Sequence, residues 1–203
     1  MTAQPGYKLP FENGDVMDRE EFHRLYSQCP GLEHVELIEG VVYMPSPTKH
    51  EGHGREQLLV LLWLGDYMRA HKGEVEAAPP ISVLLDDRNE PEPDAVLFRL
   101  APGRLQDGYV AGAPELVVEI ANTSQSRDLG PKKQAYQRTG VQDYIVWRTS
   151  DHAIDWFQLH DGVYVRSEPD AHGIIESLTF PGLRLDVPAA LAMDVDRVLA
   201  ALR

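Results

Sequence analysis

The stretches EPDAVLF (residues 92–98) and ELVVEIA (residues 115–121) decide the fold of this 203-residue chain. Each has the apolar, β-branched character of a strand, and each carries a carboxylate where an apolar residue is expected. In the second stretch Glu119 stands in an almost continuous apolar run, which is typical of a strand buried on both faces. Because burial of an unpaired carboxylate is costly, Glu119 needs a partner.

Asp94 stands at the entrance of the first of these strands. Pro93 has no N–H group to give to a β-ladder, so it is expected where a strand begins, with Asp94 at the mouth of a strand over residues 95–98. If the two strands are neighbours in a sheet, Asp94 and Glu119 converge on one divalent cation. Carboxylate oxygens suit Mg²⁺ or Mn²⁺ better than Zn²⁺.

The composition is that of a globular chain, with 43% hydrophobic residues and a net charge of −13. We expect a single domain over residues 1–203, with residues 1–14 as a loose N-terminal arm. The longest apolar stretch, residues 58–64, is far too short to span a membrane, there is no signal pattern, and one cysteine excludes an internal disulfide. These features predict a cytoplasmic protein.

The negative charge excludes a sequence-wide attraction to nucleic acid. A polyanionic substrate would therefore have to meet bound metal or a local basic patch. Six basic residues could form such a phosphate-contacting patch, although scattered solvation of a helix surface explains them nearly as well. They are Lys49, Arg55, Arg127, Lys132, Lys133 and Arg138.

Helical and strand patterns alternate along the rest of the chain. They predict an α/β (α+β) fold with a mixed central sheet flanked by helices, an additional N-terminal hairpin and additional C-terminal strands. Asp18 and Glu21 form a capping-box pattern at the first helix, and residues 101–114 form a long connection with little structure. The expected helices cover 18–27, 51–71, 128–138 and 188–202. Residues 35–44 are expected to form two strands joined by a tight turn at Gly40, and the other expected strands cover 74–77, 81–85, 95–98, 116–121, 143–147, 153–159, 163–168 and 174–180.

Lys132 is the third residue with a candidate role. Asp128, Lys132 and Tyr136 are four residues apart and share one face of the helix that follows the strand of Glu119. Lys132 can therefore reach the carboxylate pair, where it would orient a water or neutralise charge in phosphodiester hydrolysis. The alternative is an exposed ion pair with Asp128, worth only about 0.3–0.5 kcal/mol.

The order Pro93-Asp94, Glu119 and Lys132 resembles the PD-(D/E)XK nuclease superfamily, with its lysine moved from the strand to the next helix. More narrowly, the chain from about residue 32 to 185 resembles the bacterial family called Uma-two, described as restriction endonucleases. The features that carry this resemblance are a VELIEG hairpin at 35–40, a Ser-Pro loop before a helix and a Gly-Val-x-x-Tyr segment at 140–144.

The resemblance implies a restriction-endonuclease-like core and a metal-dependent endodeoxyribonuclease, with Asp94, Glu119 and Lys132 as catalytic residues. It implies Mg²⁺ or Mn²⁺ held by Asp94 and Glu119, with Glu36 of the hairpin as a further ligand, DNA as substrate and a possible homodimer. The chain departs from the superfamily at Ala121, where the third motif has its lysine, so catalysis depends on Lys132. It also has Asn122-Thr123 where the family usually has Ser-Pro.

Two other functions stay open. One is a binding or oligomerisation module that kept the nuclease fold and lost efficient chemistry, and the other is a metal-dependent hydrolase of small phosphoesters. His50 and His53 lie three residues apart at a helix entrance, as a metal-binding pair would, but no third ligand stands at a matching spacing. His50 could cap the helix or face a substrate, and most of the eight histidines are expected to be structural or solvated.

Overall fold

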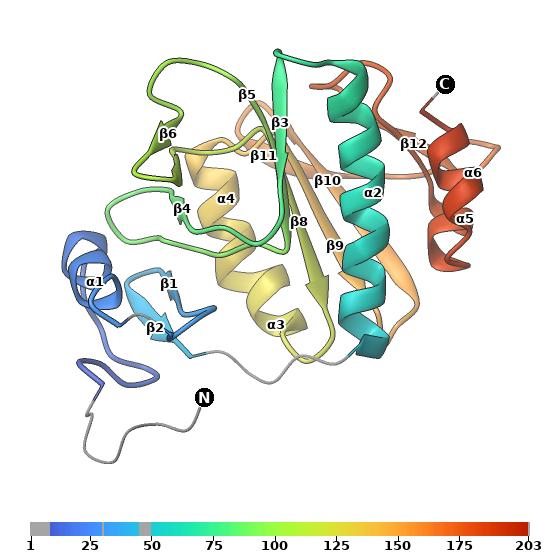
Figure 1. The fold of residues 1–203 in the computed structure, drawn as a ribbon. Coiled ribbons are helices and arrows are strands. Elements are labelled where there is room, and N and C mark those ends of the chain that lie inside the picture. The colour runs from blue at the N-terminus through green and yellow to red at the C-terminus, as the bar shows by residue number, and fades with distance from the viewer. Residues whose placement is uncertain (1–8, 30, 45–49, 203) are drawn as a thin grey trace.

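The computed structural model describes residues 9–29, 31–44 and 50–202. Its centre is a six-stranded mixed sheet in the order β11–β10–β9–β8–β5–β3 (Figure 1). The strand of Glu119, β8, pairs antiparallel with β5 and parallel with β9, so the two carboxylate-bearing strands are neighbours. The strands are β3 (Val75–Ala78), β5 (Ala95–Arg99), β8 (Leu116–Ala121), β9 (Asp143–Arg148), β10 (Ala153–His160) and β11 (Val163–Ser167).

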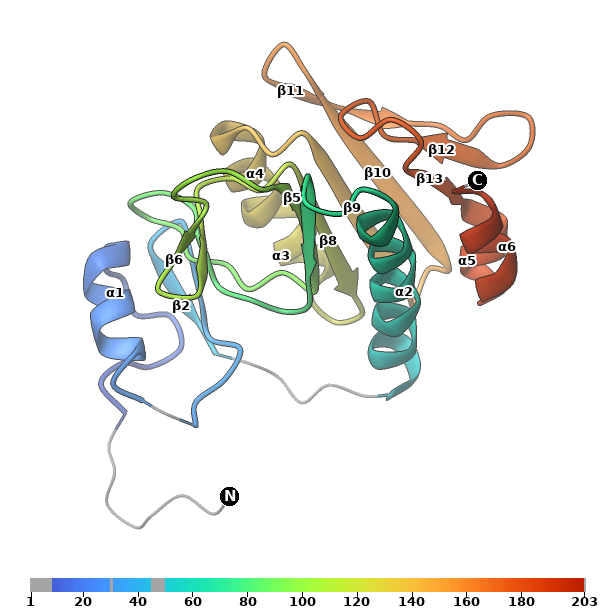
Figure 2. The ribbon, with the colours of Figure 1, turned by 45° about the horizontal axis from the view of Figure 1, so that its top comes forward.

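Helices cover both faces of this sheet, as Figures 1 and 2 show, which confirms the predicted fold class. Helix α2 (Arg55–Ala70) lies on one face, after the π-helical turn η1 (His50–Gly54). On the other face lie α3 (Gln125–Arg127), the π-helical turn η2 (Asp128–Lys132) and α4 (Lys133–Thr139). Because side chains of a strand alternate between its faces, Val117 and Glu119 point to the α4 side, and Val118 points to α2.

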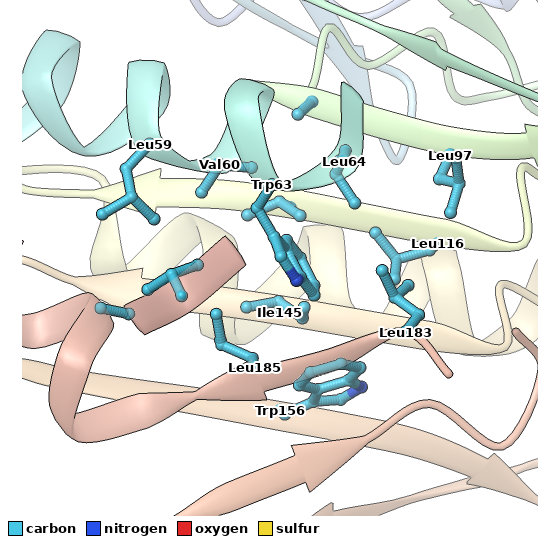
Figure 3. Close-up of a cluster of buried hydrophobic side chains, with 14 of the residues drawn as sticks. Leu59, Val60, Trp63, Leu64, Leu97, Leu116, Ile145, Trp156, Leu183 and Leu185 are labelled. Atoms are coloured by element: carbon cyan, nitrogen blue, oxygen red, sulfur yellow. The ribbon is translucent and has the colours of Figure 1, made fainter. Parts of the chain in front are cut away.

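A large apolar core lies under α2 (Figure 3). Trp63 is its centre: the ring packs edge-on against Trp156, with centroids 5.9 Å apart, and its Nε1–H donates to the carbonyl of Arg184 at 2.7 Å. Helices α5 (Val187–Leu191) and α6 (Val195–Ala200) close this core at its outer side.

The N-terminal unit consists of α1 (Arg19–Tyr26) and the hairpin of β1 (Glu36–Ile38) and β2 (Val41–Tyr43). Asp18 caps α1 by accepting from the N–H of Glu21 at 2.8 Å, as the capping pattern predicts. The hairpin is fixed to the loop before β5, because Leu37 exchanges backbone hydrogen bonds with Glu90.

Residues 9–14 are not a loose arm. Phe11 is buried, with its ring 5.8 Å from that of Phe22, and the N–H of Gly14 donates to the carbonyl of Val42. Apolar packing on α1 therefore holds this segment. The first part of the expected arm, residues 1–8, and the Ser-Pro loop at 45–47 lie outside the described residues.

The expectation that residues 101–114 have little structure is wrong. Residues 101–114 contain β6 (Leu105–Gln106) and β7 (Tyr109–Ala111), which form a small sheet with β4 (Val83–Leu84), because Asp107 and Gly108 both adopt positive φ and make a tight turn.

The C-terminal region also differs from the pattern. The expected helix over 188–202 is divided into α5 and α6, because Met193 adopts φ 58° and Asp194 starts a new helix by accepting from the N–H of Arg197. The expected strand over 174–180 ends at residue 176, as β12 (Ile174–Glu176), and pairs with β13 (Arg184–Asp186). None of the helices in the described part of the chain combines the length and apolar composition that a membrane crossing requires.

We expect Trp63→Ala to lower the free energy of unfolding by about 3–5 kcal/mol, because it leaves a cavity in the core under α2. Leu62→Ala on the same helix is the control: Leu62 is 44% exposed, so its loss costs about 0.5 kcal/mol or less. Urea unfolding followed by circular dichroism measures both. Equal losses in the two variants would contradict this description of the core.

Candidate active site

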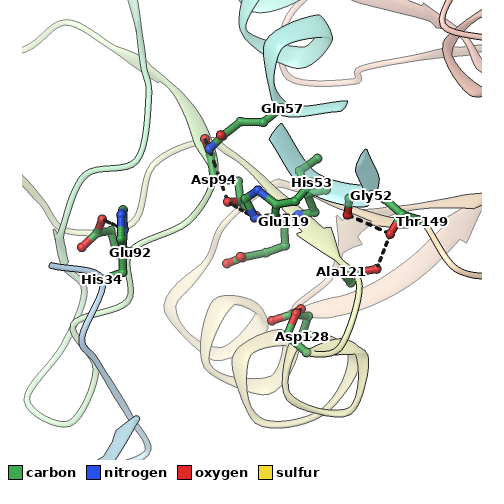
Figure 4. Close-up of polar contacts among 12 residues, drawn as sticks. His34, Gly52, His53, Gln57, Glu92, Asp94, Glu119, Ala121, Asp128 and Thr149 are labelled. Atoms are coloured by element: carbon green, nitrogen blue, oxygen red, sulfur yellow. Dashed lines mark hydrogen bonds and ion pairs between the residues drawn. The ribbon is translucent and has the colours of Figure 1, made fainter. Parts of the chain in front are cut away.

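The register of β5 and β8 places Asp94 beside Glu119. Ala95 pairs with Val118, so Asp94, one residue earlier, stands next to Glu119 and Ile120. Asp94 Oδ2 accepts a hydrogen bond from the backbone N–H of Ile120 at 2.6 Å. Figure 4 shows the two carboxylates side by side where β5 begins, as the sequence predicts if the two strands are neighbours.

Lys132 is buried between two carboxylates. Its Nζ lies 2.7 Å from Glu119 Oε1 and 2.6 Å from Glu36 Oε1, and its side chain is only 2% exposed. Glu119 thus has the partner that its place in an apolar strand demands. The alternative of an exposed ion pair with Asp128 does not hold, because that carboxylate is also buried and its Oδ1 lies 3.9 Å from Nζ.

The helical segment that carries Lys132 has an irregular backbone. Gly130, just before Pro131, leaves helical geometry at φ −107° and ψ −108°, and the π-helical turn η2 ends at Lys132. Tyr136, one turn later, donates from its hydroxyl to Glu119 Oε1 at 3.0 Å. The face shared by Asp128, Lys132 and Tyr136 therefore points at Glu119, and both contacts use the same carboxylate oxygen, Oε1.

The charges of this buried cluster do not balance. It holds three carboxylates, Glu36, Glu119 and Asp128, against two cations, Lys132 and Arg127. Asp128 Oδ2 accepts from the hydroxyl of Ser124, but Oδ1 is buried with no hydrogen-bond partner. The cluster is short of one positive charge, which a proton or a bound cation would supply.

The pKa shifts follow from burial and from these neighbours. Burial raises the pKa of Glu119 well above its usual range, against the opposing effect of Lys132, and burial likewise raises the pKa of Asp128. Burial alone would lower the pKa of Lys132, but Glu119, Glu36 and Asp128 outweigh it and raise that pKa. Lys132 therefore stays charged.

Asp94 has a second partner that the sequence does not reveal. His53 Nε2, from the turn η1, lies 2.9 Å from Asp94 Oδ1, and Gln57 Nε2 donates to the backbone carbonyl of Asp94 at 3.2 Å (Figure 4). The hydrogen bond to Asp94 raises the pKa of His53. The only sequence signal was the pair of histidines at a helix entrance, and the side chain of His50 lies outside the described part of the structure.

The remaining predicted residues are distributed as follows. Glu36 contacts Lys132, the guanidinium of Arg127 and the backbone N–H of Glu92, which donates to Glu36 Oε1 at 2.9 Å. Of the candidate basic residues that the structure describes, Lys132 is buried and Arg138 binds Glu39 and Asp86. Lys133 lies over the ring of Phe157, and Lys49 is outside the described residues.

The donor set at Asp94 and Glu119 fits a hard divalent cation. Lys132 and Tyr136 bind Glu119 through Oε1, which leaves Oε2 outside both contacts. Among the described residues, no group of three histidine, cysteine or carboxylate side chains has its atoms gathered as a preformed metal cage. Carboxylate oxygens and the missing positive charge suit Mg²⁺ or Mn²⁺, and a bound ion would compete with the side chains that now contact Asp94 and Glu119.

Comparison with known proteins identifies a protein family and solved structures of similar fold. The family model of Uma2, described as "Putative restriction endonuclease", matches residues 19–188. A crystal structure from Anabaena variabilis, described as a putative nuclease belonging to DUF820, superposes with a TM-score of 0.60 at 14% identity, covering 89% of this chain and 98% of that chain. At this identity the likeness shows the fold. No curated protein matches the chain.

We expect Lys132→Met to lower the free energy of unfolding by about 3–5 kcal/mol, because it leaves Glu36 and Glu119 buried without their counter-charge. Lys133→Met is the matched control on the next residue, and its lost contact with the ring of Phe157 costs about 1 kcal/mol. Chemical denaturation of both variants tests this, and a Lys132 variant as stable as the Lys133 variant would show that the buried ion cluster is unimportant for stability.

Proposed function

Because the chain belongs to the Uma2 family, we propose that it is a metal-dependent endonuclease that hydrolyses DNA phosphodiester bonds at Asp94 and Glu119. The observation that carries this proposal is the meeting of these two carboxylates on adjacent strands with the buried ammonium of Lys132. Two carboxylates beside a lysine are the parts that metal-assisted phosphodiester hydrolysis needs.

In this proposal Asp94 and Glu119 hold Mg²⁺ or Mn²⁺. The bound ion would neutralise charge on the scissile phosphate and lower the pKa of a water molecule. Glu36 is the weaker candidate ligand, because its Oε1 already accepts from Lys132 and from the backbone of Glu92. It could join the ion only if Lys132 moved.

The protein's own groups would act on the substrate as follows. Lys132 would take the place of the lysine that is absent at Ala121, and its charge would stabilise the pentavalent phosphate. Because its ammonium is enclosed by Glu36 and Glu119, it is fixed before substrate arrives, which lowers the reorganisation that catalysis requires. Asp94 is 16% exposed and His53 is 20% exposed, so substrate would approach from their side.

The acidic chain, with its net charge of −13, has to bind DNA through local groups and metal. Cutting both strands of a duplex would require two such sites, and therefore two copies of the chain. A reducing intracellular compartment is the setting that we propose for it.

The burial of Lys132 also favours a second candidate function. This is a binding or oligomerisation module that keeps the nuclease fold but does not cleave phosphodiester bonds. The Nζ of Lys132 is held by two carboxylates and is 2% exposed, which is how a purely structural lysine would look. This candidate predicts a folded protein that binds no Mg²⁺ or Mn²⁺ near Asp94.

We expect Asp94→Asn and Glu119→Gln each to lower the rate of plasmid cleavage in Mg²⁺ or Mn²⁺ by about 100-fold or more, because each removes a charge that holds the metal. Asp87→Asn and Glu76→Gln are matched controls, since both side chains are exposed. The products, nicked or linear plasmid, are separated on agarose gels.

Circular dichroism would establish that the four variants are folded. Unchanged cleavage in either site variant would refute the proposed function. Cleavage of model phosphodiesters without cleavage of any DNA would instead support the hydrolase of small phosphoesters.

A further inference from the structure

Arg127 is the more exposed of the two cations in the buried cluster of carboxylates. Its side chain is 29% exposed, whereas that of Lys132 is 2% exposed and enclosed by Glu36 and Glu119. A phosphate can therefore reach the guanidinium of Arg127 from solvent. Contact with the ammonium of Lys132 would first require its ion pairs to open.

The guanidinium of Arg127 makes no hydrogen bond to any described residue. Its Nη2 lies 3.5 Å from Glu36 Oε2, and its Nε, which is buried, lies 4.0 Å from Asp128 Oδ1. Both distances are longer than an N–H···O hydrogen bond. Arg138, later in the same helical segment, instead donates to Glu39 at 2.7 Å. The donors of Arg127 thus need an acceptor that the described residues do not supply.

The guanidinium is nevertheless held in place. Its central carbon lies 5.3 Å from the centroid of the Tyr43 ring, which is a cation–π contact. Tyr43 lies on β2 and Glu36 on β1, so the N-terminal hairpin, beside α3 in Figure 1, fixes the group through two residues. Burial alone would lower the pKa of Arg127, but the neighbouring carboxylates, chiefly Glu36 and Asp128, raise it. The guanidinium therefore stays charged.

This geometry suits a phosphate group. Glu36 and Asp128 lie nearest to Nη2 and Nε, along one edge of the guanidinium. The end of the group, formed by Nη1 and the outer N–H of Nη2, has no acceptor among the described residues. Two parallel N–H groups of this kind match two oxygens of a phosphate, and a guanidinium that is already oriented loses less freedom on binding.

We propose that Arg127 binds a backbone phosphate of DNA through Nη1 and Nη2, and that it supplies local positive charge that this acidic chain needs for a polyanion. The inference rests on the proposed function and deepens it by naming a residue that holds the substrate. An arginine that only neutralises the buried carboxylates would make no such contact.

Binding of a short fluorescein-labelled DNA duplex, followed by fluorescence anisotropy at several salt concentrations, tests the contact. The titrations are done in EDTA and again with Ca²⁺, an oxygen-liganded ion that can stand in for Mg²⁺. We expect Arg127→Gln to weaken binding by about tenfold or more. The slope of log K against log salt should become shallower by about 0.9, the value for one phosphate contact. A purely structural role would leave this slope unchanged.

Two further variants control the result. Arg138→Gln removes the same charge from the same helical segment, and the side chain of Arg138 is 50% exposed, but its donors already bind Glu39 and Asp86. It should bind DNA nearly as well as the wild type. Arg127→Lys keeps the charge of the cluster, and it decides the matter if circular dichroism shows that Arg127→Gln is unfolded. It should keep the salt slope and lose affinity several-fold, because an ammonium cannot form the fork.

Unchanged affinity and slope in Arg127→Gln, or an equal change in Arg138→Gln, would overturn the contact. So would wild-type affinity in Arg127→Lys if this is the only Arg127 variant that folds.

The outcomes also separate this inference from the proposed function. Weaker binding confined to the Arg127 variants, in a protein that cuts no DNA, supports the contact and refutes the nuclease. Cleavage by the wild type with unchanged binding in the Arg127 variants supports the nuclease and refutes the contact. If the folded wild type bound no duplex in either condition, both proposals would fail, and binding of a labelled mononucleotide alone would assign the site to small phosphoesters.

Discussion

The ammonium of Lys132, buried between Glu36 and Glu119, is the interaction on which the rest of the site depends. It allows a carboxylate to stand in the middle of a central strand, where an unpaired charge would be prohibitive. It also joins the N-terminal hairpin to strand β8 and the turn η2, which lie some 80 residues or more further along the chain. The hairpin therefore completes the environment of Lys132.

This arrangement divides the site into a buried part and an open part. Lys132 and Asp128 lie deep, where charges interact strongly, whereas Asp94 and His53 lie at the partly exposed end of β5. Oδ1 of Asp128 has only long ion-pair contacts with Lys132 and Arg127 and no hydrogen-bond partner, and with one carboxylate in excess the site is electrostatically incomplete by itself. A divalent cation would complete it, which connects the stability of the cluster with the proposed chemistry.

Much of the fold and the central contact could be predicted from the sequence. The apolar run around Glu119 and the proline before Asp94 indicated two strands, and the four-residue spacing from Asp128 placed Lys132 at the carboxylate. What the sequence did not show depends on long-range geometry: His53 meets Asp94 across 41 positions, and Glu36 meets Lys132 across 96. The short strands β6 and β7 were also not predicted, because two or three residues of strand beside a tight turn give too little periodic pattern.

Anomalous diffraction from crystals grown with Mn²⁺ would show whether Asp94 and Glu119 bind one metal ion. We expect an anomalous peak within bonding distance, about 2.2 Å, of carboxylate oxygens from both residues. Crystals that contain Mn²⁺ at a concentration sufficient to occupy such a site, and that show no anomalous density between these two side chains, would contradict it.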